Sequence, residues 1–327
     1  MPRVRARLSV RDWIETATIR VGYGRYDYKV VPGLYALGDP TPDSPVVVTA
    51  NYKLTFDMVR KELVGRDVWL LVADTRGINV WCAAGKALFS TDEIILSATS
   101  ARLTEVVSHR TLILPQLGAT GVAAHKVRKG CGFSVKYGPV WARDLPAFLD
   151  NDLTATETMR TVTFSLKERA ELIPVELFIL GKPLLIALVA AFLLSGIGPS
   201  VFSISAAFDR GLAAFCAVVV GILAGNSLVP LLLPLFPWRH FSIKGAVTGA
   251  VAGLLAVVFA SNLGVGEMFA LWAMSTSIAS YLAMNFTGST PFTSPTGVET
   301  EMRRAIPFQA GLLGLALIVW VAAPFMG

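Results

Sequence analysis

Cysteine is scarce in this sequence of 327 residues, and its scarcity excludes several kinds of site. Cys82, Cys131 and Cys216 are too few for a disulfide framework, which fits a reducing compartment. No second cysteine follows Cys82 after two residues and no histidine lies close to it, which argues against a thioredoxin-type site and a zinc site. The chain also lacks a cysteine-rich cluster motif, so we expect it to hold no iron–sulfur centre.

A signal peptide and a nucleic-acid motif are absent as well. The N-terminus, MPRVRARLSVRDW, is basic but has no apolar run, so we expect the first domain to stay in the cytoplasm. Residues 1–170 hold 23 Lys and Arg against 17 Asp and Glu, whereas the remainder holds six of each. The net charge of +6 therefore falls on the first half, and we expect it to face anionic lipid and no nucleic acid.

The apolar residues that are present divide the chain. They make up 54% of it, more than in an ordinary soluble protein, and the excess lies after residue 170. We therefore expect a cytoplasmic domain over residues 1–165 and a transmembrane domain over residues 166–327.

The first domain shows strands and helices in alternation. Short apolar runs and helical stretches follow one another at residues 46–49, 55–63, 68–73, 92–109, 111–114, 122–128, 133–137 and 144–150. Such alternation predicts a Rossmann-like α/β domain with a parallel sheet covered on both faces. Residues 12–45 look irregular and strand-like. The loops at residues 49–55, 74–90, 115–121 and 137–143 should gather at one edge of the sheet.

Cys82 lies in the most informative of these loops, within the stretch NVWCAAGK at residues 79–86. Good helix formers follow it, so Cys82 should lie in the first turn of a short helix, where the dipole favours a thiolate. Such a thiolate can be a nucleophile, a redox centre or a metal ligand. A single soft ligand suits a metal whose other positions are filled from outside the protein, as in a corrinoid, whose ring supplies four nitrogens to cobalt.

NVWCAAGK resembles, at all eight positions, the cap-helix motif of the mercury-methylating corrinoid proteins. This family is related to the corrinoid-binding domain of the large subunit of the corrinoid iron–sulfur protein. The resemblance continues in PGLYALGDP from Pro32, VTANYKLTFD from Val48, LPQLGATGV from Leu114 and YGPV from Tyr137. It covers most of the first 165 residues, and that family also has a membrane half. The resemblance implies that Cys82 is the lower axial ligand to cobalt.

Further candidate residues lie in the cap motif and in the neighbouring loops. Thr49, Asn51, Gln116, Thr120 and Tyr137 are candidates to hydrogen-bond the amides of the ring periphery, although each is also an ordinary loop residue. Glycines allow backbone to approach a flat face closely. The remaining candidates for cofactor binding are Asn79, Val80, Trp81, Ala83, Ala84, Gly85, Lys86, Leu117, Gly118, Gly121 and Gly138.

The roles of some of these residues stay open. We expect Trp81 to pack and fix the cap, and Lys86 either to complete the cap electrostatically or to be a solvated helix residue. Cys131 should be structural, and Cys216 should face lipid or another helix.

The second half predicts an all-α transmembrane domain of five helices. The apolar segments, each about as long as a bilayer is thick, are residues 175–197, 212–236, 246–263, 268–286 and 306–325. Residues 199–208 suggest a short re-entrant or interfacial piece, and GAVTGAVAGLL from Gly245 suggests close helix packing.

The charges of the loops predict the orientation of the transmembrane domain. If the first domain is inside, Arg210 is the only Lys or Arg in the outer loops. The inner loops then carry Lys167, Arg169, Arg239, Lys244, Arg303 and Arg304. We therefore expect a multi-pass protein of the cytoplasmic membrane with its C-terminus outside.

The resemblance implies that a methyl group passes from cobalt to inorganic Hg(II), giving methylmercury. It also implies a ferredoxin-like [4Fe-4S] partner as electron donor, and a methyl-donating methyltransferase or methyl-folate. Two alternatives stay open: a corrinoid methyl carrier for another acceptor in one-carbon metabolism, and a non-enzymatic membrane thiol sensor or transporter. The few charges within the spans argue against transport.

Overall fold

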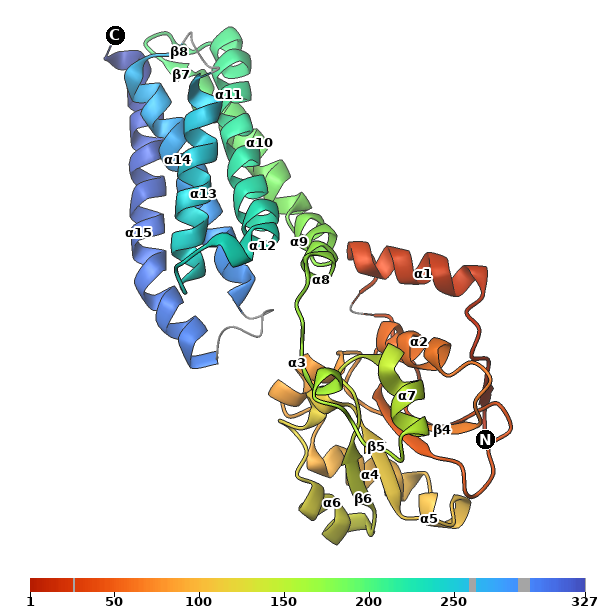
Figure 1. The fold of residues 1–327 in the computed structure, drawn as a ribbon. Coiled ribbons are helices and arrows are strands. Elements are labelled where there is room, and N and C mark those ends of the chain that lie inside the picture. Colours follow the sequence, from red (N-terminus) through yellow and green to blue (C-terminus); the bar gives the residue numbers. More distant parts are fainter. Residues whose placement is uncertain (26, 259–262, 288–294, 327) are drawn as a thin grey trace. The chain divides into compact units, whose positions relative to one another are not determined.

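The computed structural model describes all residues except 26, 259–262, 288–294 and 327. The chain divides into two compact units, Met1–Thr163 and Phe164–Gly327. Figure 1 shows a mixed α/β first unit and a helical second unit.

A six-stranded sheet forms the centre of the first unit. Its strands are β1 (Arg3–Val4), β2 (Gly33–Leu37), β3 (Val46–Ala50), β4 (Val68–Ala73), β5 (Thr111–Leu114) and β6 (Ser134–Tyr137). Their order is β1-β2-β4-β3-β5-β6. Strands β3 to β6 are parallel, as predicted, but β2 in the N-terminal segment runs antiparallel to β4, so the sheet as a whole is mixed. The eight-residue connection at 38–45 is too short for a crossover helix, and the chain therefore reverses direction between β2 and β3.

Helices cover both faces of this sheet, as expected (Figure 1). They are α1 (Val10–Val21), α2 (Lys53–Glu62), α3 (Val80–Gly85), α4 (Thr91–Ser100), α5 (Leu103–Val106), α6 (Ala124–Cys131) and α7 (Leu145–Asp150), with 3-10 turns η1 (Gln116–Gly118), η2 (Ala142–Asp144) and η3 (Thr158–Arg160). Alternate residues of β3 face opposite sides: Val46 and Val48 join the cluster that contains α3, α4 and α6, whereas Val47 joins the one with α2 and α7.

Two local predictions were wrong. Part of the supposedly irregular N-terminal segment is the helix α1, which begins with a capping box in which Ser9 and Asp12 bond each other's backbone N–H. The helix expected over residues 92–109 is two helices, α4 and α5, because Arg102 adopts a left-handed conformation with φ of 47°.

The second unit is helical. Its elements are α8 (Leu166–Ala170), α9 (Ile173–Ile179), α10 (Gly181–Gly196), the strands β7 (Ile197–Gly198) and β8 (Val201–Phe202), α11 (Ile204–Ile222), the π-helix η4 (Leu223–Leu228), α12 (Val229–Leu231), the 3-10 turn η5 (Leu233–Leu235), α13 (Phe241–Val258), α14 (Val265–Asn285), α15 (Pro295–Ala322) and the 3-10 turn η7 (Ala323–Phe325). Residues 199–208, predicted as a re-entrant or interfacial piece, contain the turn and second strand of the β7–β8 hairpin and the start of α11, and their position in a membrane stays a prediction.

Three helical segments among the described residues are long and apolar enough to cross a membrane: Ile204–Leu231, Phe241–Val258 and Thr296–Phe325. A fourth is possible if Leu166–Ile179 and Gly181–Gly196, bent by 53°, form one span. The helix α14 is not among these segments, and its polar residues, such as Ser275, Thr276 and Ser277, lower its hydropathy. Five spans therefore stay a prediction, and residues 259–262, near the end of the expected span 246–263, lie outside the described residues.

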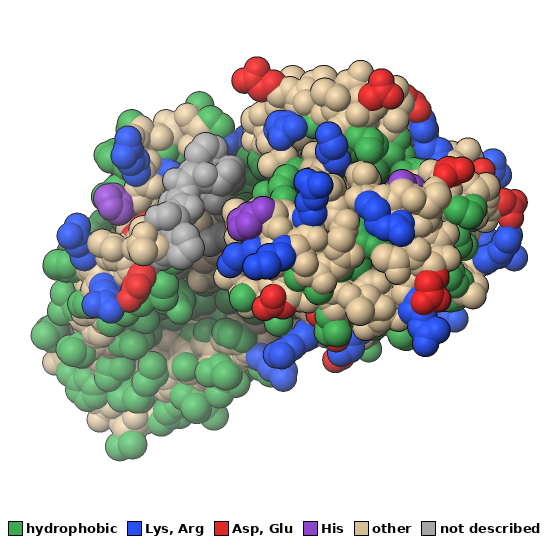
Figure 2. All heavy atoms as spheres, turned by 90° about the horizontal axis from the view of Figure 1, so that it is seen from below, with side chains coloured by type: hydrophobic (Ala, Val, Ile, Leu, Met, Phe, Trp, Pro, Cys, Tyr) green, Lys and Arg blue, Asp and Glu red, His purple; other side chains and the backbone are tan. Residues whose placement is uncertain are grey.

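Glycines on two helices contact α14, which confirms the expected close packing. A side chain at Gly249 of α13 would approach the backbone oxygen of Ser275 to 2.9 Å, and one at Gly225 of η4 would approach that of Ala279 to 2.5 Å. Hydrophobic side chains dominate the surface of this unit in the view of Figure 2. Six of the seven basic residues assigned to loops by the sequence pattern lie within helices. They are Lys167 and Arg169 in α8, Arg210 in α11, Lys244 in α13, and Arg303 and Arg304 in α15.

Candidate functional site

The order of the parallel strands places a switch point between β3 and β5. From β3 the chain crosses through α2 to β4, and from β5 it crosses through α6 to β6 on the other side. Ligands of open α/β sheets bind outside the carboxyl ends of the strands at such a point. The loops after β3, β4, β5 and β6, predicted to share one edge, all lie at these carboxyl ends.

Asn51, directly after β3, shapes the loop that leads to the cap helix. Its side-chain oxygen accepts hydrogen bonds from the backbone N–H of Thr75 (3.0 Å) and of Gly77 (2.9 Å), and its amide nitrogen donates to Asp74 (3.0 Å). Asn51 and Thr75 are buried. The oxygen of Asn51, expected to bind a ring amide, is therefore used within the chain, and the residue positions the loop.

The loop delivers the chain to α3, and Cys82 lies in its first turn as predicted. The side-chain oxygen of Asn79 caps the helix by accepting a hydrogen bond from the backbone N–H of Cys82 at 2.9 Å. Val80, Ala83 and Ala84 are buried against the core. The opposite face is exposed and consists of Trp81, Cys82, Gly85 and Lys86. Trp81, expected to pack, is 38% exposed.

Gly85 lies one turn after Cys82 on this exposed face. A side chain there would meet nothing within 4 Å, and Gly85 is not among the glycines with positive φ. Neither backbone conformation nor packing within the chain therefore requires a glycine at this position. Its absent side chain leaves room beside the Cys82 thiol for a flat group.

The loop after β5 packs against the segment that follows the cap. A side chain at Gly118 would come within 2.6 Å of the Phe89 ring, and one at Gly121 within 2.2 Å of the Phe89 backbone oxygen. These glycines, predicted to approach a ring, thus allow η1 to pack beside α3. Since α3 follows β4 and η1 follows β5, the two meet beside the end of β3.

The other candidate residues differ in how accessible they are. Thr120 is exposed, whereas Gln116 and Leu117 are half-buried and Gly138 is buried. The hydroxyl of Tyr137 donates to the backbone oxygen of Val122, and burial raises its pKa above the ordinary value. The Tyr137 proton is therefore engaged within the chain.

Two buried polar atoms near this edge have no hydrogen-bond partner among the described residues. One is the hydroxyl of Thr49 at the end of β3, a predicted candidate, and the other is Nε1 of Trp141 in the loop after β6. Buried polar groups are nearly always hydrogen-bonded, so both are suited to meet a polar group from outside the chain. Trp141 was not among the residues predicted from the sequence, although it directly follows the motif YGPV.

Among the described residues, no three side chains of His, Cys, Asp or Glu gather as a metal site. Cys131 is half-buried with its thiol donating to the Val127 oxygen (3.3 Å), which fits the predicted structural role. Cys216 is exposed on α11.

Strand order and cap together define a doubly wound α/β domain with a helical cap at its switch point. Residues 24–149, which include the whole candidate site, match the family described as CO dehydrogenase/acetyl-CoA synthase delta subunit.

Curated relatives agree with this match. The chain is 33% identical over 130 residues to the acetyl-CoA decarbonylase/synthase complex subunit gamma of Methanopyrus kandleri, covering 39% of this chain and 28% of that protein. The subunit of the same name from Archaeoglobus fulgidus is 31% identical over 130 residues, covering 39% and 27%. The one from Methanocaldococcus jannaschii is 39% identical over 95 residues, covering 28% and 19%. The chain thus spans about a quarter or less of the length of these relatives.

Proposed function

We propose that the first unit binds a corrinoid at the carboxyl edge of its sheet and serves as a methyl carrier, with the Cys82 thiolate as lower axial ligand to cobalt. The observation that carries this proposal is the exposed Cys82 beside the open space at Gly85. The match over residues 24–149 supports it, because the relatives are subunits of a complex named for acetyl-CoA chemistry.

The residues of the site fit a corrinoid. A corrinoid, when bound, supplies a cobalt atom that takes up a methyl group and releases it to an acceptor. Asn79 holds the backbone at Cys82, and Asn51 fixes the loop before it, so the thiolate is presented from a preorganised cap. Thr49 and Trp141 offer unpartnered polar atoms to groups at the ring edge, whereas Asn51 and Tyr137 are engaged elsewhere.

We further propose that inorganic Hg(II) accepts the methyl group, giving methylmercury. The support is the likeness of NVWCAAGK to the cap motif of the mercury-methylating proteins and the position of Cys82 within it. A thiolate is a strong electron donor, so Cys82 favours departure of the methyl group with its bonding pair to a soft acceptor. The second candidate is a carrier for another acceptor in one-carbon metabolism, which the names of the relatives favour.

The proposed partners follow from the chemistry. Returning cobalt to its reduced state requires an electron donor, for which we propose a ferredoxin-like [4Fe-4S] protein, because the three cysteines of this chain form no cluster motif. The methyl group would come from a methyltransferase or from methyl-folate.

The decisive experiment is an ultraviolet–visible spectrum of the anaerobically purified, corrinoid-reconstituted protein, compared between the native chain, Cys82→Ala and the control Cys131→Ala. We expect a thiolate–cobalt signature in the native chain and the control, lost in Cys82→Ala. Identical spectra in all three would refute the axial ligand. Methyl transfer to Hg(II), measured on the same proteins, then separates the mercury proposal from a carrier for another acceptor. A failure to bind any corrinoid would favour the thiol sensor or transporter.

We propose that the second unit anchors the protein in the cytoplasmic membrane, with the first unit in the cytoplasm and the C-terminus outside. The three or four helical segments of sufficient length and apolarity support the anchoring. The test is a topology reporter fused after residue 327, with a second fusion before residue 1 as its control. Reporter activity on the same side for both fusions would exclude five spans.

A further inference from the structure

We propose that α1 is a membrane-surface helix whose apolar face lies at the boundary between headgroups and acyl chains of an anionic bilayer and holds the first unit there. This inference rests on the proposed membrane attachment of the second unit. It concerns a surface remote from Cys82 in the sequence and independent of the corrinoid.

Five residues form an apolar stripe along α1. They are separated by three, one, three and four positions, which places them on one face of a helix: Val10, Trp13, Ile14, Ala17 and Val21. All are exposed, Val10 by 77%, Trp13 by 53% and Ile14 by 60%. A continuous exposed stripe with a tryptophan at its centre is typical of helices that lie in a membrane interface.

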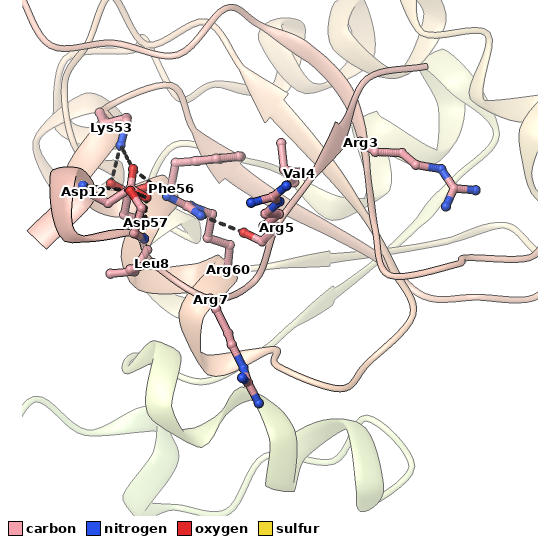
Figure 3. A pocket seen from close by; sticks show the side chains of 11 residues that line it. Arg3, Val4, Arg5, Arg7, Leu8, Asp12, Lys53, Phe56, Asp57 and Arg60 are labelled. Carbon is pink, nitrogen blue, oxygen red and sulfur yellow. Dashed lines mark hydrogen bonds and ion pairs between the residues drawn. The ribbon is translucent and has the colours of Figure 1, made fainter.

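The acidic residues of α1 point the other way. Figure 3 shows Asp12 turned toward Lys53 and Asp57 of α2. Oδ1 of Asp12 lies 3.0 Å from Nζ of Lys53 and 2.9 Å from Nη2 of Arg60. Oε2 of Glu15 lies 3.7 Å from the same Nζ of Lys53. Thr16 and Ile19 are buried on the same side. The ion pairs therefore fix the rotation of α1 so that its acids face inward and its apolar stripe faces outward.

Basic residues precede the stripe in the chain and lie beside its tryptophan. The segment before α1 alternates Arg3, Arg5 and Arg7, all exposed, of which Arg3 pairs with Asp39, and Arg7 points away from the ion-pair cluster in Figure 3. Lys61 of α2 places its ammonium 5.8 Å from the Trp13 ring. Residues 1–29 hold seven Lys and Arg and three Asp and Glu, and two of these acids face inward. The surface around the stripe thus complements anionic lipid headgroups.

A short linker limits how far the first unit can move from a bilayer that the second unit crosses. Only the five residues 161–165 separate η3 from α8, and five extended residues reach at most about 18 Å. If the helices of the second unit cross a membrane, the first unit stays close to its surface, so weak lipid contacts become effective through high local concentration.

The test uses the full chain in proteoliposomes, with a nitroxide at Ile14→Cys in a background of Cys82→Ala, Cys131→Ala and Cys216→Ala. The matched control carries the label at Lys126→Cys, an exposed position of α6. Power-saturation spectroscopy compares collisions with oxygen, which enters lipid, and with a water-soluble nickel chelate. In vesicles with one-third phosphatidylglycerol we expect the oxygen-to-nickel ratio at position 14 to exceed that at position 126 several-fold. In pure phosphatidylcholine, and with Arg3, Arg5 and Arg7 changed to Gln, the difference should shrink.

Equal ratios at the two positions in anionic vesicles would overturn the proposal. So would a label at position 14 that neither reagent reaches, because protein would then cover the stripe. Extraction of the chain by alkaline carbonate would instead show that the membrane attachment itself is wrong. Quenching of tryptophan fluorescence by brominated lipid, larger in the unlabelled chain than in Trp13→Phe, checks the result without cysteine replacement.

Discussion

At Gly85, the residue that would stabilise the helix most differs from the one that the proposed corrinoid binding requires. Alanine is favoured over glycine within a helix by about 1 kcal/mol, and a side chain at position 85 meets nothing in the chain. We expect Gly85→Ala to raise the free energy of unfolding by up to about that amount and yet to weaken corrinoid binding, because the methyl group intrudes beside Cys82. Urea unfolding without corrinoid and titration with corrinoid measure the two effects. Gly311→Ala, another helical glycine with open space around it, should stabilise without affecting binding. Unchanged affinity in Gly85→Ala would place the ring elsewhere.

Asn51 holds the loop that precedes the cap helix α3. In Asn51→Ala the backbone N–H groups of Thr75 and Gly77 lose their acceptor in a buried loop. Each buried unsatisfied group costs about 1–3 kcal/mol, so we expect a loss of roughly 2–6 kcal/mol in unfolding free energy, together with faster alkylation of Cys82 as the cap loosens. Thr120→Ala, at an exposed position of a neighbouring loop, is the control and should change stability by less than about 0.5 kcal/mol. A normal alkylation rate in Asn51→Ala would contradict the positioning role.

At the scale of elements, the attachment of α1 depends on pH through Asp12. Burial alone would raise the pKa of this carboxyl, but hydrogen bonds from Ser9, Lys53 and Arg60 together hold it well below its usual range. A carboxyl with a lowered pKa stabilises the folded state above its unfolded pKa of about 3.9, and this contribution disappears as the pH falls further. We expect Asp12→Asn to destabilise the first unit at pH 7 and, because part of this contribution is already lost at pH 3, to destabilise it by a smaller amount there, measured by urea unfolding in detergent. A constant difference at both pH values would refute the ion-pair attachment.

Some strands and helices of the first unit could be predicted from the sequence and others could not. Continuous apolar runs identified β3, β4 and β5, because a buried parallel strand needs apolar residues on both faces. The edge strand β6 was predicted from the shorter stretch FSVKY, which includes the exposed Lys136. The helix α1 was missed, although the spacing of its apolar residues is helical and the Ser9–Asp12 box marks its start. The direction of β2 depends on a connection too short for a helix, which no periodicity reveals.

Those parts of the candidate site that depend on local sequence could be predicted, and those that depend on distant residues could not. The position of Cys82 follows from local helix signals, but the tasks of Asn51 and Gly118 depend on residues distant in the sequence, Thr75 and Phe89. A polar loop residue and a loop glycine look alike in sequence whether they face a ligand or the chain's own backbone. Three-dimensional contacts alone distinguish the two.

At the scale of the whole molecule, the two units should fold separately, because contacts group the chain into Met1–Thr163 and Phe164–Gly327. The first unit has its own core on both faces of the sheet, with Phe89, Phe133 and Phe148 fully buried. We expect residues 1–163, produced alone, to unfold in one cooperative transition and to bind a corrinoid as the full chain does. Calorimetry and the cobalt spectrum provide the two measurements, with Cys82→Ala in the same fragment as control. An unfolded fragment would show that the second unit completes the first, and the membrane helices would then contribute to the site as well as to the anchor.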